Sequence, residues 1–143
     1  MISLSLIDVK KPAFLKIREL KNYLRALIEA EGFRTGDVSI VFCGDEYLLK
    51  VNQDFLQHDY YTDIITFDYC ENGRVNGDLI ISLDRVLDNS EIEKVSFKEE
   101  LYRVVFHGAL HLCGYKDKRE KDILMMRSKE SHYLNRLVSR ETV

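Results

Sequence analysis

Four stretches of the chain carry the pattern of β-strands. Apolar and polar residues alternate over residues 2–9 and 37–43, which is the period of a strand with one buried face. Residues 64–69 and 79–83 are rich in β-branched and aromatic residues, and we expect strands there as well. Between these two lies Asn72-Gly73, and an Asn-Gly pair at such a place is a strong signal for a hairpin turn.

Helical spacing, with apolar residues every three or four positions, occupies much of the remaining chain. The predicted helices run from Pro12 to Gly32, from Asp45 to about Phe55, from Asp84 to Glu93, from Phe97 to Cys113, and from about Asp117 to Leu137. Ser96 is followed three residues later by Glu99, which fits a capping box at the start of the fourth helix. Gly114 is expected to end that helix in a left-handed conformation.

The order β-α-β-α-β-β-α-α-α predicts an α+β fold, a single domain over residues 1–143. We expect a mixed sheet of about four strands covered by helices. The helix over 97–113 is apolar almost all round, so it is predicted to be the buried central helix. Hydrophobic residues make up 45% of the 143 residues and charged residues 31%, as in ordinary globular proteins.

The cellular compartment is predicted from the absence of membrane-spanning and secretion signals and from the cysteines. No apolar run is long enough to span a membrane, and the first residues look like a strand and not like a secretion signal. The three cysteines are Cys43, Cys70 and Cys113, an odd number without a CxxC pair. Reduced, buried thiols in a cytoplasmic protein are therefore expected.

Charge is unevenly distributed, although the net charge of −3 argues against a general polyanion binder. Residues 1–34 hold seven Lys and Arg against four acids, and residues 100–143 hold nine against six. Residues 35–99 hold five against fourteen. Two interpretations stay open: the basic ends form one surface in space, or they are two solvated helix faces.

The strongest chemical signal is a pair of histidines on the central helix. His107 and His111 are four residues apart, and on a helix they lie on one face, about 40° apart. Two imidazoles on a buried helix need partners, and a divalent metal is one. Gly114 lets the chain turn back, so Asp117 can become a third ligand. Three protein ligands leave a position for water, which is the arrangement of catalytic zinc sites.

A blander interpretation is two core histidines bonded to carbonyls or carboxylates. A peptidase of the HExxH type is disfavoured, because Gly108 stands where such an enzyme has its glutamate base. Cys113 is a metal ligand by type, but it lies on another side of the helix and is expected to be core.

Three sequence blocks resemble the YbeY family of bacterial metallo-endoribonucleases. Residues 107–117, His-Gly-Ala-Leu-His-Leu-Cys-Gly-Tyr-Lys-Asp, resemble the family signature H-G-x-L-H-L-x-G-Y-D-H. Residues 62–67, Thr-Asp-Ile-Ile-Thr-Phe, are similar to its P-T-D-V-L-S-F strand. Residues 77–82, Gly-Asp-Leu-Ile-Ile-Ser, are similar to its G-D-I-x-I-S strand.

This resemblance implies hydrolysis of single-stranded RNA, with a role in 16S rRNA 3′-end maturation and late ribosome quality control. It implies single-stranded rRNA and the small ribosomal subunit as partners, neither DNA nor a membrane, and one divalent metal, zinc. By position, His107, His111 and Asp117 are the metal ligands, and His107 lies at the catalytic centre.

Two departures from the family pattern change what is expected. The third ligand of the family is histidine and here is Asp117, which is acceptable for zinc and also suits harder metals such as Mn²⁺. The family arginine thought to serve the phosphate is replaced by Leu56. The candidates for a replacement cation are Lys116, predicted as catalytic, and His58 and Arg119, predicted to bind substrate.

Other functions remain open from sequence alone. One is a metal-dependent hydrolase of another substrate, such as a peptide or small ester. Another is a ribosome-assembly factor without catalysis that keeps the metal for stability. Tyr60, Tyr61 and Tyr115 are expected either to stack on unpaired bases or to serve ordinary packing.

Overall fold

One mixed sheet forms the centre of the protein in a computed structural model that describes residues 1–56 and 62–138. Its strands are β1 (Ile2–Leu6), β2 (Arg34–Cys43), β3 (Ile64–Asp68) and β4 (Arg74–Ser82), in the spatial order β1-β2-β4-β3. β1, β2 and β4 are parallel, whereas β3 runs antiparallel to β4 and forms one edge. The predicted α+β fold with a mixed four-stranded sheet is confirmed.

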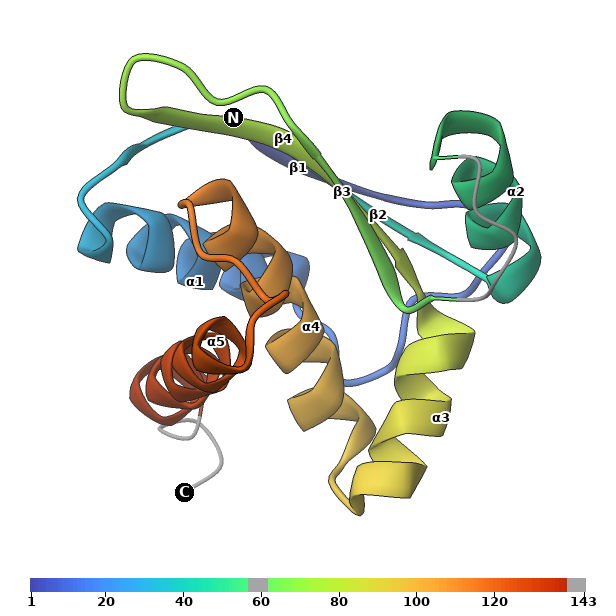
Figure 1. Cartoon of the computed structure of the whole chain (residues 1–143). Coiled ribbons are helices and arrows are strands. Elements are labelled where there is room, and N and C mark those ends of the chain that lie inside the picture. Colours follow the sequence, from blue (N-terminus) through green and yellow to red (C-terminus); the bar gives the residue numbers. More distant parts are fainter. Residues whose placement is uncertain (57–61, 139–143) are drawn as a thin grey trace.

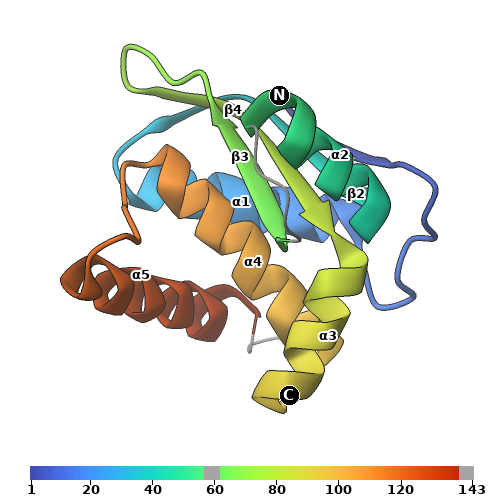
Figure 2. The same ribbon diagram turned by 45° about the vertical axis from the view of Figure 1, so that its right-hand side comes forward.

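Helices cover both faces of this sheet (Figure 1). They are α1 (Ile17–Ala30), α2 (Asp45–Leu56), α3 (Leu83–Glu93), α4 (Phe97–Leu112) and α5 (Glu120–Tyr133), followed by a π-helical turn, η1 (Leu134–Val138). α1 and α4 pack on one face and α2 on the other. α4 lies between α1 and α3, and α5 packs against α4 on the side away from the sheet (Figure 2). None of the described helices is both long and apolar enough to cross a membrane.

The main core lies between the sheet and the pair α1 and α4. α1 buries residues at helical spacing: Leu20, Tyr23, Leu24, Leu27 and Ile28. α4 is buried on nearly all sides, as the sequence predicted for the central helix. A second, smaller cluster beneath α2 contains Cys43, Leu48, Val51 and Ile65. The three cysteines are free thiols, and Cys113 packs against the main core as expected.

α4 approaches the sheet closely at Gly108. A Cβ atom at this position would lie 2.7 Å from Cδ1 of Ile64 on β3 and 2.8 Å from Cδ2 of Leu79 on β4. Both distances are shorter than van der Waals contact, so any larger residue would push the helix away from these strands. The glycine therefore decides how near the histidines of α4 lie to the start of β3.

Turn and capping signals in the sequence are confirmed. Asn72 and Gly73 both have positive φ, 53° and 73°, as a tight hairpin turn between β3 and β4 requires. The Ser96 hydroxyl accepts a hydrogen bond from the backbone N–H of Glu99 at 3.0 Å and caps α4. Gly114 has φ 105° and follows the end of α4.

Several predicted boundaries were wrong. The first strand ends at Leu6, not residue 9, and α1 begins at Ile17 because residues 12–15 form a separate turn. β4 begins at Arg74, since the pairing with β2 extends past a bulge into polar residues. α5 begins at Glu120, which leaves Asp117 in a loop that can bend toward α4.

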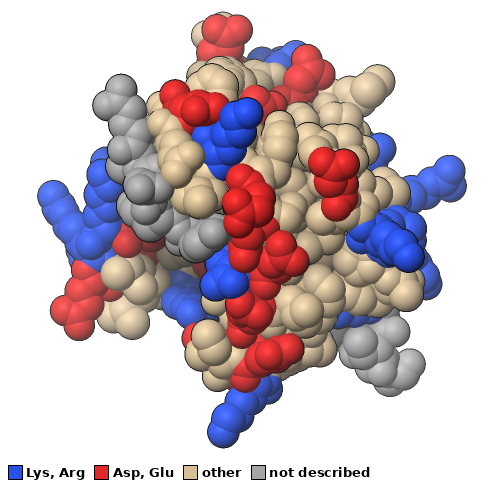
Figure 3. Space-filling model, turned by 90° about the vertical axis from the view of Figure 1, so that its right-hand side faces the viewer, with Lys and Arg blue, Asp and Glu red and all other residues tan. Residues whose placement is uncertain are grey.

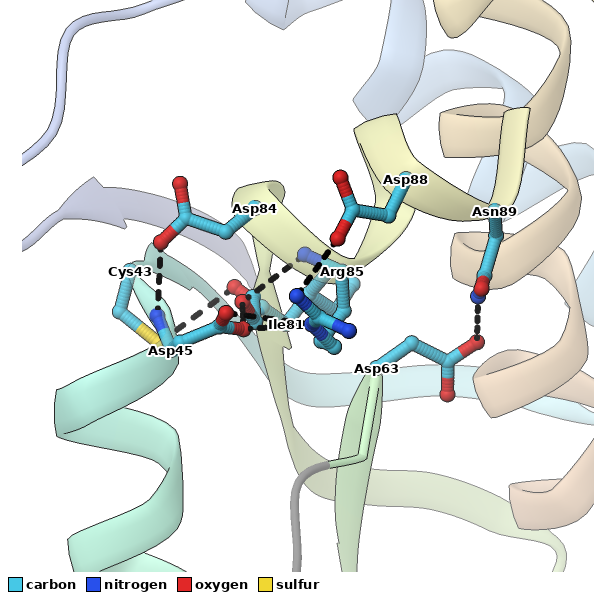
Figure 4. Close-up of polar contacts among 9 residues, drawn as sticks. Cys43, Asp45, Asp63, Ile81, Asp84, Arg85, Asp88 and Asn89 are labelled. Atoms are coloured by element: carbon cyan, nitrogen blue, oxygen red, sulfur yellow. Dashed lines mark hydrogen bonds and ion pairs between the residues drawn. The ribbon is translucent and has the colours of Figure 1, made fainter. Parts of the chain in front are cut away.

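Acidic residues gather on one face of the molecule. Figure 3 shows Asp and Glu gathered in a central band on the side of α2 and α3, with Lys and Arg at its margins. Within this face, the backbone N–H of Asp45 donates to Asp84 at 2.9 Å, and Arg85 contacts Asp45 at 3.0 Å and Asp88 at 2.6 Å (Figure 4). These contacts tie the first turns of α2 and α3 together, so this group has a structural explanation.

Candidate metal centre

Three side chains converge at the end of α4. His107 and His111 lie on its last two turns, and Asp117 comes from the loop after Gly114. Oδ2 of Asp117 lies 3.3 Å from Nε2 of His107 and 3.2 Å from Nε2 of His111. Among the described residues, these form the one group of three donors whose atoms all lie within 4.8 Å of one another.

Each imidazole is held through its other nitrogen. Nδ1 of His111 lies 2.9 Å from the backbone carbonyl oxygen of Tyr115. A carbonyl oxygen can only accept, so Nδ1 carries the proton and donates it. Nδ1 of His107 donates in the same way to Oε2 of Glu130 at 2.6 Å. In both neutral rings the lone pair on Nε2 is therefore directed toward Asp117.

This arrangement fits a bound cation. Two nitrogen lone pairs and a carboxylate oxygen face one another at 3.2 to 3.3 Å, with no proton between them when the rings are neutral. Acceptors repel one another at such distances unless a positive charge lies among them, either a metal ion or a proton on one imidazole that donates to Asp117. Two imidazoles and a carboxylate are a donor set for divalent metals such as zinc, and three protein ligands leave further positions for water or substrate.

Glu130 supports His107 from α5. Its side chain is only 4% exposed, and its second oxygen, Oε1, accepts from Arg103 at 3.2 Å and lies 3.7 Å from Arg127. A carboxylate behind a metal-binding histidine fixes the tautomer and the ring orientation. Burial acts to lower the pKa of His107, but the hydrogen bond and charge of Glu130, with the nearby carboxylates, outweigh it and raise that pKa.

Two cavities meet at the three converging side chains, and they share Asp63, Ile64, His107 and Asp117. The first has a volume of about 470 Å³ and extends toward α3 and α5. Its charged lining residues include Glu93, Glu100, Arg103, Arg127 and Glu130. The second has a volume of about 630 Å³ and extends toward α2. Its lining residues include Asn52, Leu56, Thr66, Asp68 and Lys116. Both volumes are in the range of ligand sites.

Asp63 is a third carboxylate at this junction. It precedes β3, and its Oδ2 accepts a hydrogen bond from Nδ2 of Asn89 on α3 at 3.3 Å (Figure 4). Burial raises the pKa of Asp63, against the opposing effect of His107 and of backbone N–H groups. A half-buried carboxyl with a raised pKa beside a metal-type donor set is a candidate for proton transfer.

The structure tests the placement of the sequence candidates. It brings His107, His111 and Asp117 together, and it places Lys116 in the wall of the second cavity. Arg119 is exposed at the start of α5 and lines neither of these cavities.

The remaining sequence candidates are His58 and three tyrosines. His58, Tyr60 and Tyr61 lie outside the described residues, so their roles stay predictions. Tyr115 donates its hydroxyl to Oε1 of Glu31 at 2.6 Å, which gives its ring a structural role. Its backbone carbonyl accepts a hydrogen bond from Nδ1 of His111.

Four residues of the site were not found from the sequence: Asp63, Arg103, Arg127 and Glu130. A signal existed for Glu130, because it stands on the stripe of α5 that buries Met126 and Tyr133, where a charged residue needs a partner. Arg103 lies one turn before His107 on the buried helix α4, where a charged residue also needs a partner. Asp63 lies within one of the family-like blocks but has no local pattern that indicates chemistry.

Comparison with known proteins identifies relatives over most of the chain. A sequence model of the family "Endoribonuclease YbeY" matches residues 7–138. Endoribonuclease YbeY of Parabacteroides distasonis is 46% identical over 127 residues, covering 89% of each chain. Endoribonuclease YbeY of Phocaeicola vulgatus is 45% identical over 134 residues, covering 94% of this chain and 96% of its own.

A solved structure agrees with the fold. The solution structure of a Thermotoga maritima protein is similar with a TM-score of 0.71 and 26% identity, covering 99% of this chain and 92% of that one. The assignment rests on the matching family model and on the two relatives that are 46% and 45% identical over 89% and 94% of this chain. The chain belongs to the YbeY endoribonuclease family.

Proposed function

We propose that this protein is a metal-dependent endoribonuclease that hydrolyses phosphodiester bonds of single-stranded RNA. The observation that carries the proposal is the convergence of His107, His111 and Asp117 where two cavities meet, in a member of an endoribonuclease family. Its proposed setting is the cytoplasm, in 16S rRNA 3′-end maturation and ribosome quality control, with the small ribosomal subunit as partner.

The proposed cofactor is one Zn²⁺ ion held by Nε2 of His107, Nε2 of His111 and a carboxylate oxygen of Asp117. Such an ion would supply Lewis acidity and a water of lowered pKa. The protein's own contribution is orientation: Glu130 and the Tyr115 carbonyl hold the two Nδ1 protons, so that both Nε2 atoms stay available. Asp117 adds a negative charge that the histidine of the family pattern does not have.

Three cations beside the site are candidates for contacts with RNA phosphates. Lys116 lines the second cavity, and Arg103 and Arg127 line the first, where both also contact Glu130 and carboxylates outnumber them. Phosphates bind such groups by charge, independently of sequence. This placement partly compensates for Leu56, which lines the second cavity where the family pattern has an arginine. His58 and Arg119 are further proposed substrate contacts.

The test is cleavage of labelled single-stranded RNA by purified protein reconstituted with Zn²⁺ or Mn²⁺. Duplex RNA and single-stranded DNA of the same sequence serve as comparison substrates. We expect cleavage of the single-stranded RNA only, abolished by a chelator and by His111→Ala. Hydrolysis of peptides or esters in place of RNA would indicate another hydrolase. Binding to small subunits without any cleavage would indicate an assembly factor.

A further inference from the structure

The histidine motif lacks a proton-handling carboxylate of its own. In HExxH metallopeptidases a glutamate next to the first histidine handles protons, and here that place is Gly108. The space is occupied by β3 and β4, because a Cβ at Gly108 would lie 2.7 Å from the side chain of Ile64. The residue before Ile64 is Asp63. Gly108 offers no carboxylate, but its lack of a side chain lets β3 pack close to α4. Asp63, just before β3, then lines the same cavities as His107.

Asp63 reaches the site from outside the motif. It lines both cavities, and His107 and Asp117 are the other titratable residues that do so. Its backbone carbonyl accepts from the N–H of Ser82 at 2.9 Å, and its carboxylate accepts from Asn89 at 3.3 Å. The main chain and the side chain are therefore both held, and Figure 4 shows the carboxylate turned toward Asn89 of α3.

Asp63 is also available for chemistry. Among the described residues it does not belong to the three-donor group, so that group does not use its carboxylate. It has the partner that an acid–base residue needs, a neutral amide that fixes the carboxylate without neutralising it.

We propose that Asp63 is the catalytic proton-transfer residue of RNA hydrolysis, a proposal that rests on the function proposed above. Its carboxylate takes a proton from the attacking water as the water oxygen forms its bond to phosphorus. The carboxylic acid then gives that proton to the leaving ribose oxygen as the old phosphorus–oxygen bond breaks. The products are a hydroxyl end and a phosphate end, and Asp63 returns to its carboxylate form.

The experiment compares wild type with Asp63→Asn, which keeps the shape and removes the base. We expect kcat on single-stranded RNA to fall about 100-fold or more, the size of a lost acid–base group. Bound metal per chain and the Kd for RNA should stay within about twofold. On bis(p-nitrophenyl) phosphate, whose leaving group needs no proton, the loss should be clearly smaller. Asp54→Asn, an exposed carboxylate of α2, is the matched control.

A second variant guards against a folding artefact. Asn89→Ala leaves Asp63 in place but removes its orienting amide, and we expect kcat to fall about tenfold with metal content unchanged. If Asp63→Asn keeps more than half of wild-type kcat, the inference is wrong while the nuclease function stands. Equal losses on both substrates, or loss of the metal, would also overturn it. Wild-type protein that cuts no RNA would overturn the proposed function and this inference together.

Discussion

The two histidines of the site have different kinds of support. His111 is held by the backbone carbonyl of Tyr115, four residues further on, and it faces Asp117 of the same turn. His107 is held by Glu130, 23 residues away on α5, which in turn contacts Arg103. We call the first group, residues 111–117, the motif half and the second, with Asp63, the remote half.

The difference teaches which parts of the site depend on the fold. The donors of the motif half are brought together by local structure, a helix end and a left-handed glycine. The remote half needs α5 and β3 to pack correctly against α4. Substitution of a ligand should therefore remove the metal outright, while substitution of a residue that only supports His107 should weaken or misdirect metal binding.

The largest expected effect on metal binding is that of Asp117→Ala in the motif half. Removing one of three donors should weaken metal binding by more than about 100-fold, since even outer contacts of metal sites are worth about 10- to 100-fold. Metal analysis after gel filtration should show one equivalent in wild type and almost none in the variant. Asp117→His, which restores the family residue, should retain the metal. Undiminished binding in Asp117→Ala would remove Asp117 from the ligand set.

A smaller loss of metal affinity is expected for Glu130→Gln in the remote half. The amide is a weaker acceptor for the Nδ1 proton of His107, and Arg103 loses its charged partner. We expect metal affinity, measured by competition with a chelating dye, to fall about 10- to 100-fold. Glu120→Gln, on the exposed first turn of the same helix, is the control. Equal affinities of Glu130→Gln and wild type would show that His107 does not need this support.

The two halves also offer different cations to the RNA. Lys116→Ala in the motif half and Arg127→Ala in the remote half each remove one cation from a cavity wall. Each phosphate contact that is lost should lower the slope of log K against log salt by about 0.7 for a single strand. Fluorescence anisotropy across a salt series measures this, with Lys50→Ala as an exposed control. The variant whose slope does not change identifies the cavity that the RNA backbone does not use.

The smallest effect concerns Glu31, at the end of α1, which supports the motif half from a distance. It accepts hydrogen bonds from Tyr115 and Tyr133, and Lys129 lies 3.4 Å away. Burial acts to raise the pKa of Glu31, but these donors outweigh it and hold that pKa below its usual range. Glu31→Gln should cost about 1–3 kcal/mol of stability at neutral pH.

The sign of the pH dependence follows from the lowered pKa of Glu31. Its stabilisation is complete above the unfolded pKa and is lost as pH falls through the folded pKa. The difference in Tm between wild type and Glu31→Gln should therefore be largest near pH 7 and shrink as the pH falls through the lowered pKa of Glu31. Glu29→Gln on the exposed side of α1 provides the comparison. A difference that stays constant with pH would show that the charge of Glu31 is not what stabilises the turn.

Local signals in the sequence predicted much of the fold. The hairpin at Asn72-Gly73, the cap at Ser96 and the turn at Gly114 were correct, because each depends on the conformational preference of one or two residues. Boundaries were wrong where tertiary packing decided them. β4 extends to Arg74 because β2 lies beside it, and a strand neighbour is not visible in local sequence.

For the site, the sequence by itself determined the ligand candidates and the family. His107, His111 and Asp117 are close in the chain, so helix geometry and one turn suffice to bring them together. The tertiary structure alone decided their surroundings, since Asp63 lies just before β3 and Glu130 lies on α5. Residues so far apart in sequence meet only when the core packs, and the space at Gly108 that admits β3 exists only in the folded protein.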